Sequence, residues 1–316
     1  MVISLGSLAV GSRSIDLATV VEALTNWDPG DREHLIVRDL RGPRTLIGLL
    51  VGVALGLSGA LLQGLTRNPL ADPGILGISG GAALAAASSV LFLGIGSVYG
   101  YVWFAFAGAA IGGALVYAIA SQGRDGASPI KLALAGAAVT AIMTSLTSLI
   151  LLLDLATLNV LRFWLVGSLA GRSMTVAGQL WPFIAVGSAA ALVSGRLLNA
   201  LSLGEEVARS LGVRLFKARL LVGVSAVVLA GSATAAAGPI VFIGLTIPHL
   251  ARAITGPDYR WVLPYSAVLA PVLLLGSDIV GRIAARPAEL QVGIVTALIG
   301  GPFFVALVRR KKLAEL

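Results

Sequence analysis

Residues 45–66 read TLIGLLVGVALGLSGALLQGLT, a run of 22 residues without a single Asp, Glu, Lys or Arg. A helix needs about 20 apolar residues to cross the hydrocarbon core of a bilayer. Because this run is apolar on every side, it predicts a transmembrane helix rather than a strand of a membrane barrel, in which apolar and polar residues alternate. Gly48, Gly52 and Gly56 recur at every fourth position. Small residues at that spacing let membrane helices approach closely, so we interpret these glycines as packing residues.

Similar uncharged runs continue along the chain. They cover residues 73–123, 132–153, 173–195, 220–251, 261–277 and 290–308. Two of them are too long for one crossing, and we expect breaks at residues 94–100 and at Gly238 and Pro239. The sequence therefore predicts nine complete transmembrane helices in one all-α integral membrane domain, residues 1–316. The composition agrees, because 57% of the residues are apolar and only 12% are charged, about half the charge of a soluble domain.

The charged residues predict an orientation. If the basic C-terminus, residues 309–312, lies in the cytoplasm, counting back through nine spans places residues 11–44 in an extracytoplasmic loop and residues 196–219 in a cytoplasmic loop. Of the 23 basic residues, 14 then fall on the cytoplasmic side, as the positive-inside rule favours. A basic face beside anionic lipid explains the net charge of +8 without a nucleic acid partner.

Several functional classes lack the residues that they need. The chain has no cysteine and only two histidines, His34 and His249, so we expect neither a thiolate site nor a zinc cluster. No lysine follows a glycine, which excludes a phosphate-binding loop, and we expect no ATP hydrolysis by this chain. The glycine-rich segment GISGG at residues 77–81 is interpreted as helix packing.

Two other classes remain as alternatives to a transport subunit without catalysis. An ion-coupled secondary transporter usually carries Asp, Glu or His near the middle of the membrane, and the predicted spans hold none there. An integral membrane enzyme would need a cluster of such residues at one membrane face, and none is visible, so we predict no catalytic residue. Asp278 lies near the end of a span, four residues before Arg282, which predicts a local ion pair.

A short amphipathic segment, LGEEVARSLGV, occupies residues 203–213 of the predicted cytoplasmic loop. Two glycines bracket about two helical turns, and acidic residues stand at the start, where the helix dipole favours them. The expected apolar face consists of Val207, Ala208 and Leu211. Composition alone leaves two interpretations open, namely an interfacial helix that rests on lipid headgroups and a docking helix for a cytoplasmic partner.

The ordered motifs of the chain resemble those of the FecCD family of permeases, which belong to importers for iron siderophores, haem and cobalamin. The motifs are LRGPRT at 40–45, SGA at 58–60, NPLADP at 68–73, LG at 76–77, GPI at 238–240, FIGL at 242–245 and IPH at 247–249, with further matches at 203–212 and 278–290. The resemblance covers nearly the whole chain. It implies the type II ABC importer permease fold with ten transmembrane helices, of which the first is represented only by residues 1–10.

The resemblance also implies a multi-pass subunit of the bacterial inner membrane that works in an assembly. Expected partners are a second permease subunit, identical or paralogous, two cytoplasmic ATPase subunits, an extracytoplasmic binding protein and the lipid bilayer. ATP and Mg²⁺ would bind to the ATPase subunits, and this chain would bind no cofactor. The expected function is translocation of an iron–siderophore complex by alternating access, with haem or cobalamin as other cargoes.

Three sets of site residues follow from the same resemblance. The ATPase coupling segment consists of Leu203, Gly204, Glu205, Ala208, Arg209, Leu211 and Gly212. The cytoplasmic gate consists of Asn68, Leu70 and Ser128, although an Asn-Pro pair is also typical of a turn that ends a helix. The outer arginines Arg41, Arg44 and Arg282 match positions that receive acidic residues of the binding protein, with headgroup anchoring as the plainer interpretation.

Overall fold

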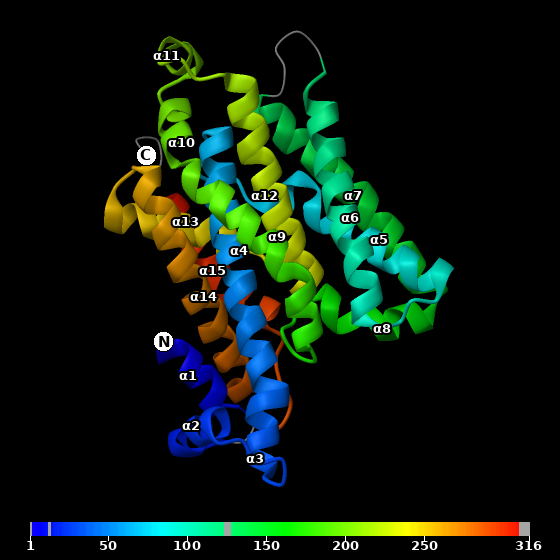
Figure 1. Ribbon diagram of the computed structural model, residues 1–316. Coiled ribbons are helices and arrows are strands. Elements are labelled where there is room, and N and C mark those ends of the chain that lie inside the picture. Colours follow the sequence, from blue (N-terminus) through cyan, green and yellow to red (C-terminus); the bar gives the residue numbers. More distant parts are fainter. Residues whose placement is uncertain (1, 12–13, 123–127, 310–316) are drawn as a thin grey trace.

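The computed structural model describes residues 2–11, 14–122 and 128–309, and every regular element among them is helical (Figure 1). In chain order the helices are α1 (Val2–Ala9), α2 (Leu17–Thr25), α3 (Arg32–Leu35), α4 (Gly42–Thr66), α5 (Ile78–Leu93), α6 (Val98–Ala120), α7 (Pro129–Leu153), α8 (Leu155–Leu165), α9 (Met174–Val193), α10 (Gly195–Ser202), α11 (Glu205–Ser210), α12 (Leu215–Ala237), α13 (Ile243–Thr255), α14 (Tyr259–Ala284) and α15 (Val292–Arg309). A π-helical segment (Ile36–Arg41) joins α3 to α4, and a 3₁₀ turn (Pro73–Leu76) precedes α5. The predicted all-α class is confirmed.

Within the described part of the chain, six helical segments have the length and composition needed to cross a membrane. They are the continuous helix Arg32–Thr66, which includes α4, and the helices α6, α7, α9, α12 and α14. The other three predicted spans are shorter, with 16 residues in α5, 13 in α13 and 18 in α15. At the usual rise per residue α13 is about 20 Å long, which falls short of a bilayer core. The predicted count of nine complete spans is therefore not confirmed for the described residues.

The predicted break after α12 explains why α13 is short. Gly238 has a φ of 79°, a left-handed conformation that glycine adopts without strain. A Cβ atom there would lie 1.8 Å from the carbonyl oxygen of Trp164, so no other residue fits. The chain then stays non-helical as far as Phe242, which packs against Gly300 of α15. Such backbone is tolerated at membrane depth where protein covers it.

The helix α4 runs through the middle of the bundle (Figure 1). In its most apolar window 78% of the residues are buried, compared with 28% for α7. A Cβ atom at Gly52 would lie 2.5 Å from Cα of Pro271, and one at Gly56 would lie 2.4 Å from the carbonyl oxygen of Ser266. Only glycine therefore lets α14 approach α4 this closely. The packing interpretation of the glycine repeat is confirmed.

The GISGG segment at residues 77–81 also serves helix packing. A Cβ atom at Gly81 would lie 2.2 Å from the carbonyl oxygen of Gly108 on α6, and the reverse contact at Gly108 is equally close at 2.3 Å. The backbones of α5 and α6 are thus in direct contact at this pair of glycines. The segment is part of a helix interface, as predicted, and not a cradle for phosphate.

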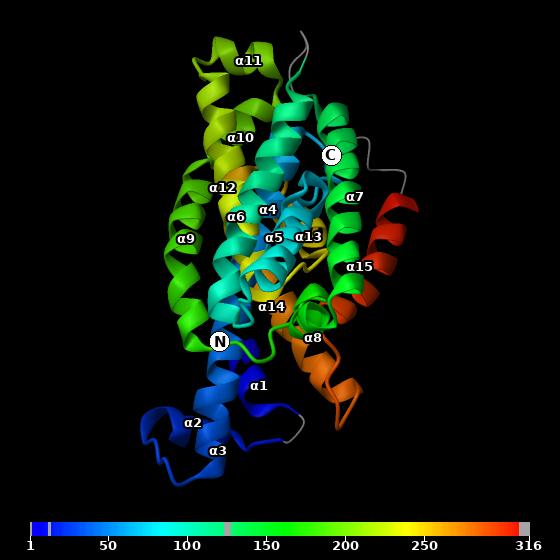
Figure 2. The ribbon, with the colours of Figure 1, turned by 90° about the vertical axis from the view of Figure 1, so that its right-hand side faces the viewer.

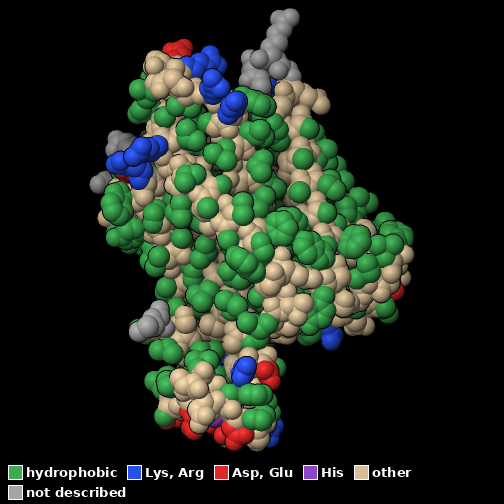
Figure 3. Space-filling view, in the orientation of Figure 1, with side chains coloured by type: hydrophobic (Ala, Val, Ile, Leu, Met, Phe, Trp, Pro, Cys, Tyr) green, Lys and Arg blue, Asp and Glu red, His purple; other side chains and the backbone are tan. Residues whose placement is uncertain are grey.

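Charged side chains gather at the two ends of the molecule, and a largely apolar belt lies between them (Figure 3). We call them the α11 end, which includes α10, α11, residues 67–72 and the start of α7, and the α2 end, which includes α1, α2, α3 and residues 285–291. The view in Figure 2 also shows α11 and α2 at opposite ends. This separation agrees with the opposite sides predicted for residues 196–219 and 11–44. Arg124 and residues 310–312, which entered the charge count, lie outside the described residues.

Candidate functional site

The helix predicted at residues 203–213 is present as α11. It is bracketed by Gly204 and Gly212, whose φ angles of 103° and 80° favour glycine. The acidic first turn suits the helix dipole, as predicted, and Arg209 in the last turn suits it as well. The surrounding segment, residues 196–219, is less of a loop than we expected, because α10 and the first turn of α12 fill much of it.

The side chains of α11 divide between two faces. Ala208 is fully buried and packs with Leu201 of α10 and Ala218 of α12. In contrast, Leu203, Val207 and Leu211 are 62%, 44% and 61% exposed. The single apolar face predicted for this segment is therefore wrong, since Ala208 points inward while the larger side chains point outward. The outward row is a small apolar surface at a charged end of the molecule.

Glu205 is the charged centre of the α11 end. One carboxylate oxygen accepts a hydrogen bond from Arg219 of α12 at 2.5 Å and lies 3.9 Å from Nη2 of Arg67, and the other lies 3.8 Å from Arg209. The hydrogen bond and the charge of Arg219 lower the pKa of Glu205 below its ordinary value. The contacts of Glu205 thus join α11 to α12 and to Arg67, the C-cap residue of α4, which sequence reasoning did not foresee.

The predicted gate residue Asn68 ends α4 in a tight turn. Its Oδ1 accepts a hydrogen bond from the Leu70 amide at 2.9 Å, and its carbonyl oxygen accepts one from the Ala71 amide. Ser128 is the N-cap of α7, because its Oγ accepts a hydrogen bond from the Lys131 amide at 3.3 Å. The plainer interpretation of the Asn-Pro pair, a helix-ending turn, is confirmed. A role in gating stays a prediction.

A hollow of about 40 Å³ separates this turn from the first turns of α7. It is lined by Leu62, Thr66, Asn68, Ala71, Asp72, Leu76, Leu132 and Ala133. The structure therefore brings the Asn68 turn beside the helix that Ser128 begins. Burial raises the pKa of the Asp72 carboxyl to about 6, although a hydrogen bond from the Gly74 amide acts in the opposite direction.

The three outer arginines lie together at the α2 end, but two of them are committed to carboxylates of the same chain. Arg44 binds Asp278 through two nitrogens, the shorter contact being 2.8 Å, and binds Glu289 at 2.6 Å. Arg282 binds Asp278 at 2.7 Å, so the predicted ion pair at this spacing is present. Asp278 is fully buried between the two guanidinium groups.

Arginines of this cluster also bind the end of α1. Arg41 donates hydrogen bonds to the carbonyl oxygens of Leu8 and Ala9, both at 2.7 Å. Arg282 donates hydrogen bonds to the carbonyl oxygens of Ser7 and Val10, at 2.8 and 2.9 Å, and Arg286 donates one to the carbonyl oxygen of Gly11 at 2.5 Å. Five consecutive carbonyl oxygens are thus bound by guanidinium groups, which favour the negative end of a helix dipole.

Little of the three predicted docking residues reaches the surface. Arg41 is 7% and Arg282 is 2% exposed, and the side chain of Arg44 is 11% exposed. The most exposed acid of the cluster is Glu289, with a side chain that is 30% exposed. Contact with a partner stays a prediction, and it would have to begin at Arg44 and Glu289. Sequence reasoning missed the carbonyl contacts because backbone acceptors leave no trace in residue types.

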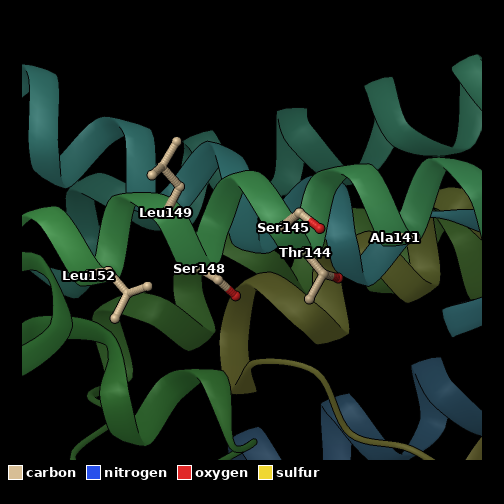
Figure 4. Close-up of a pocket in the computed structure, with 6 residues that line it drawn as sticks. All are labelled: Ala141, Thr144, Ser145, Ser148, Leu149 and Leu152. Atoms are coloured by element: carbon tan, nitrogen blue, oxygen red, sulfur yellow. The ribbon is translucent and has the colours of Figure 1, made fainter.

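An open groove of about 630 Å³ follows the outer face of α7. Figure 4 shows that its lining comes from this one helix, with the hydroxyl groups of Thr144, Ser145 and Ser148 among Leu149 and Leu152. Hydroxyl groups on the outer face of a span are unusual, because lipid tails would offer them no hydrogen-bond partner. Thr144 and Ser148 stand four residues apart in an uncharged span, and this spacing could have predicted the polar face of α7 from the sequence.

Buried polar groups also join α4 to α13. Arg252 donates a hydrogen bond to Oε1 of Gln63, and the Gln63 amide nitrogen reaches the carbonyl oxygens of Gly244 and Leu245 at 3.3 and 3.2 Å. His249 contacts the Leu245 carbonyl oxygen through Nδ1 at 2.9 Å. Among the described residues no group of three or more His, Cys, Asp or Glu could hold a metal ion.

Comparison with known proteins places these features in one family. Residues 1–310 match the FecCD transport family. The chain belongs to this family. It is 46% identical over 306 residues to the ferric enterobactin transport system permease protein FepD of Escherichia coli K12, covering 96% of this chain and 91% of FepD. It is 44% identical over 304 residues to YfiZ of Bacillus subtilis 168, assigned as a siderophore transport system permease, covering 96% of this chain and 91% of YfiZ.

A solved structure agrees with this assignment. The fold matches that of a protein assigned as a metal-chelate type ABC transporter in an inward-facing conformation, with a TM-score of 0.84 and 30% identity. The match covers 98% of this chain and 96% of that one. As a member of the FecCD transport family with six clear membrane spans among the described residues, the protein is a multi-pass permease of the bacterial inner membrane.

Proposed function

We propose that the chain is the membrane-spanning permease of an ATP-driven importer for an iron–siderophore complex. The observation that carries the proposal is α11, which offers an exposed apolar row at one end of the bundle while Ala208 holds it firmly from beneath. A small helix held in this way can pass on the movement of a soluble partner. ATP and Mg²⁺ bind to that ATPase partner, and this chain carries no catalytic residue.

The residues of the coupling segment have different roles. Leu203, Arg209 and Leu211 contact the ATPase, together with Val207, because these side chains point away from the bundle. Ala208 seats the helix. Gly204 and Gly212 supply the turns on either side. This division fits the docking interpretation, and α11 lies at the extreme end of the molecule, beyond the largely apolar belt (Figure 3).

The groove on α7 lies on the translocation path, where a second permease subunit, identical or paralogous, completes it. Only 28% of the most apolar window of α7 is buried within the chain, which leaves a long face to cover. Small hydroxyl groups among leucines suit a large chelate, because they offer hydrogen bonds without a fixed charge that would hold the cargo. Asn68, Leu70 and Ser128 act as the gate at the α11 end.

The extracytoplasmic binding protein docks at the α2 end, and Arg44 takes part in the contact. Its guanidinium is already held by Asp278 and Glu289. A carboxylate of the partner therefore reaches Arg44 by replacing Glu289, the more exposed of the two. Arg41 and Arg282 act from beneath by holding α1 and Asp278 in place. They support the docking surface more than they touch the partner.

An iron–siderophore complex is the cargo that relatives favour, since FepD is named for ferric enterobactin and YfiZ is assigned to siderophore transport. Haem and cobalamin are the other cargoes to test. Family membership gives no support to an ion-coupled secondary transporter or to a membrane enzyme.

Uptake into liposomes that contain the permease with its ATPase tests the proposal. With the binding protein and a ferric siderophore outside, uptake should require ATP inside and should stop when ATP is replaced by a non-hydrolysable analogue. Ferric catecholate, ferric hydroxamate, haem and cobalamin, supplied in turn, identify the cargo. Uptake that continues without ATP, or a purified permease that retains no ATPase subunit, would overturn the assignment.

A further inference from the structure

We infer that Glu205 transmits the movement of α11 to the Asn68 turn through its contact with Arg67. The inference rests on the proposed function, because it concerns how an ATPase bound to α11 would act on the gate. It assigns Glu205 to the inside of the coupling segment rather than to the surface that the ATPase touches. Arg67 and Arg219 thereby enter the coupling machinery as positioning residues.

The neighbouring acid shows that the environment of Glu205 is specific. The Glu205 carboxylate lies within 4.0 Å of three arginines on three elements, at 2.5 Å from Arg219, 3.8 Å from Arg209 and 3.9 Å from Arg67. Glu206, one residue later, is exposed and forms no ion pair with a described residue. Because a helix turns by 100° per residue, the two acids point in different directions. Only Glu205 faces the bundle.

Arg67 lies between this carboxylate and the gate, because it directly precedes Asn68 in the chain. It is the C-cap residue of α4 and has a φ of 47°, the left-handed region that side chains other than glycine rarely adopt. Asn68 follows directly, and its side chain closes the turn on Leu70. A change in the position of the Arg67 side chain therefore acts on the backbone at the first residue of the turn.

The distances suggest which contact changes. Arg219 is close enough to fix the Glu205 carboxylate on α12, whereas Arg67 lies near the limit of an ion pair. A small displacement of α11 would make or break the longer contact while the shorter one holds. A contact that is present in one conformation and absent in the other shifts the equilibrium between them by the free energy of that contact. This holds even where the contact adds little to overall stability. Weak exposed pairs suit this purpose.

The first test compares Glu205→Gln with Glu206→Gln, which remove the same charge one residue apart. In the reconstituted importer Glu205→Gln should keep the ATPase subunit bound and hydrolysing, but cargo taken up per ATP should fall about threefold, the range that a weak exposed pair supports. Glu206→Gln should match the unaltered protein. Equal ratios for the two variants would overturn the inference.

A second test separates transmission from simple seating of α11. Arg67→Gln should lower uptake per ATP as Glu205→Gln does, and the double variant should be no worse than either single one, because both remove the same contact. If Glu205 only fixes α11 on α12, Arg219→Gln will reproduce the loss and Arg67→Gln will not. That result would also overturn the inference.

The gate itself can be followed with a single thiol, because the chain contains no cysteine. In an Ala71→Cys protein, labelling by a water-soluble maleimide should change rate by several-fold when ATP binds, and Glu205→Gln should abolish that change. An ATP response that persists in the Glu205→Gln background refutes the inference. If the unaltered permease fails to retain an ATPase, the proposed function fails instead, so the two failures are distinguishable.

Discussion

At the scale of single residues, Arg282 illustrates how a buried charge is made tolerable. Its guanidinium is 2% exposed and binds Asp278, Ser7 and the carbonyl oxygens at the end of α1. Removing one partner of such a pair leaves the other charge buried and uncompensated. We expect Arg282→Gln to lower the free energy of unfolding in detergent by about 3 kcal/mol, measured as a loss of thermal stability.

The matched control is Arg32→Gln, which removes the same charge from an exposed position on the α2 end. It should change the thermal midpoint by little, since exposed charges contribute little to stability. If both variants are equally stable, the buried cluster does not anchor α1 and the arginines are available to other partners.

Asp72 gives a residue-scale prediction about pH. Its pKa is about 6 in the folded protein, against 3.8 as its ordinary value. Because the folded form holds the proton more tightly, its contribution to stability is fully present below about pH 4 and is lost as pH rises through 6. The free energy of unfolding falls by at most about 3 kcal/mol over this range, and by less because Asp72 is only half-buried and water screens its charge. Thermal midpoints between pH 4.5 and 7 should therefore fall less for Asp72→Asn than for the unaltered protein.

Asp154 serves as the control for this slope. Hydrogen bonds from the Thr157 hydroxyl and amide lower the pKa of Asp154. In the folded protein its carboxylate therefore stays ionised between pH 4.5 and 7. Asp154→Asn should leave the slope between pH 4.5 and 7 unchanged. A steeper slope for Asp72→Asn would contradict the raised pKa.

At the scale of secondary-structure elements, α11 is held by Ala208, and the large side chains of Val207 and of the flanking Leu203 and Leu211 are exposed. We expect Leu211→Asp to weaken binding of the ATPase subunit at least about tenfold, because it puts a charge into the apolar centre of the contact. Co-purification of the ATPase with the permease measures this. Leu24→Asp makes the same change at an exposed leucine of α2, at the opposite end, and should leave the ATPase bound. Loss in both variants would point to misfolding.

The α5–α6 contact offers a second test at this scale. Gly81→Ala would bring a Cβ atom to 2.2 Å from the Gly108 carbonyl oxygen, so the two helices must separate. We expect a loss of about 2 kcal/mol in stability, as for other overpacked sites. Gly178→Ala in α9 meets nothing within 4 Å and should be neutral or slightly stabilising. Equal thermal midpoints for these variants would show that α5 and α6 are less tightly packed than described.

Sequence reasoning succeeded where one residue type has one physical use. The glycines at 48, 52 and 56 needed only their spacing to be identified as packing residues, and Gly204 and Gly212 needed only their position beside an acidic helix start. It foresaw the break at Gly238 and Pro239 but not how short α13 would be, because a span is counted from apolar composition, whereas the extent of the irregular backbone at 238–242 depends on contacts with Trp164 and Gly300. It also assigned Ala208 to the wrong face, since residue type does not say which side the bundle covers.

At the scale of the whole molecule, the two ends differ in a way that composition could show only in part. The separation of residues 11–44 from residues 196–219 followed from counting spans. The internal commitment of the outer arginines did not, because Arg44 and Glu289 are 245 residues apart and meet only through the fold. An arginine in a membrane protein is as easily a structural ligand as a docking residue, and only its partners distinguish these roles.

The partners of Arg44 make its docking role testable by a gain as well as a loss. Glu289→Gln releases Arg44 from its exposed partner while Asp278 still holds it. Association of the binding protein with the reconstituted importer should then become about threefold faster at low salt, with a steeper salt dependence, because an accessible positive charge attracts a carboxylate. Arg44→Gln should slow association and flatten its salt dependence.

Glu22→Gln removes the same charge from an exposed site on α2 and controls for the general electrostatic field of this end. If Glu289→Gln and Glu22→Gln raise the rate equally, the field alone steers the partner and Arg44 makes no contact. If only Glu289→Gln raises it, the partner competes with Glu289 for Arg44.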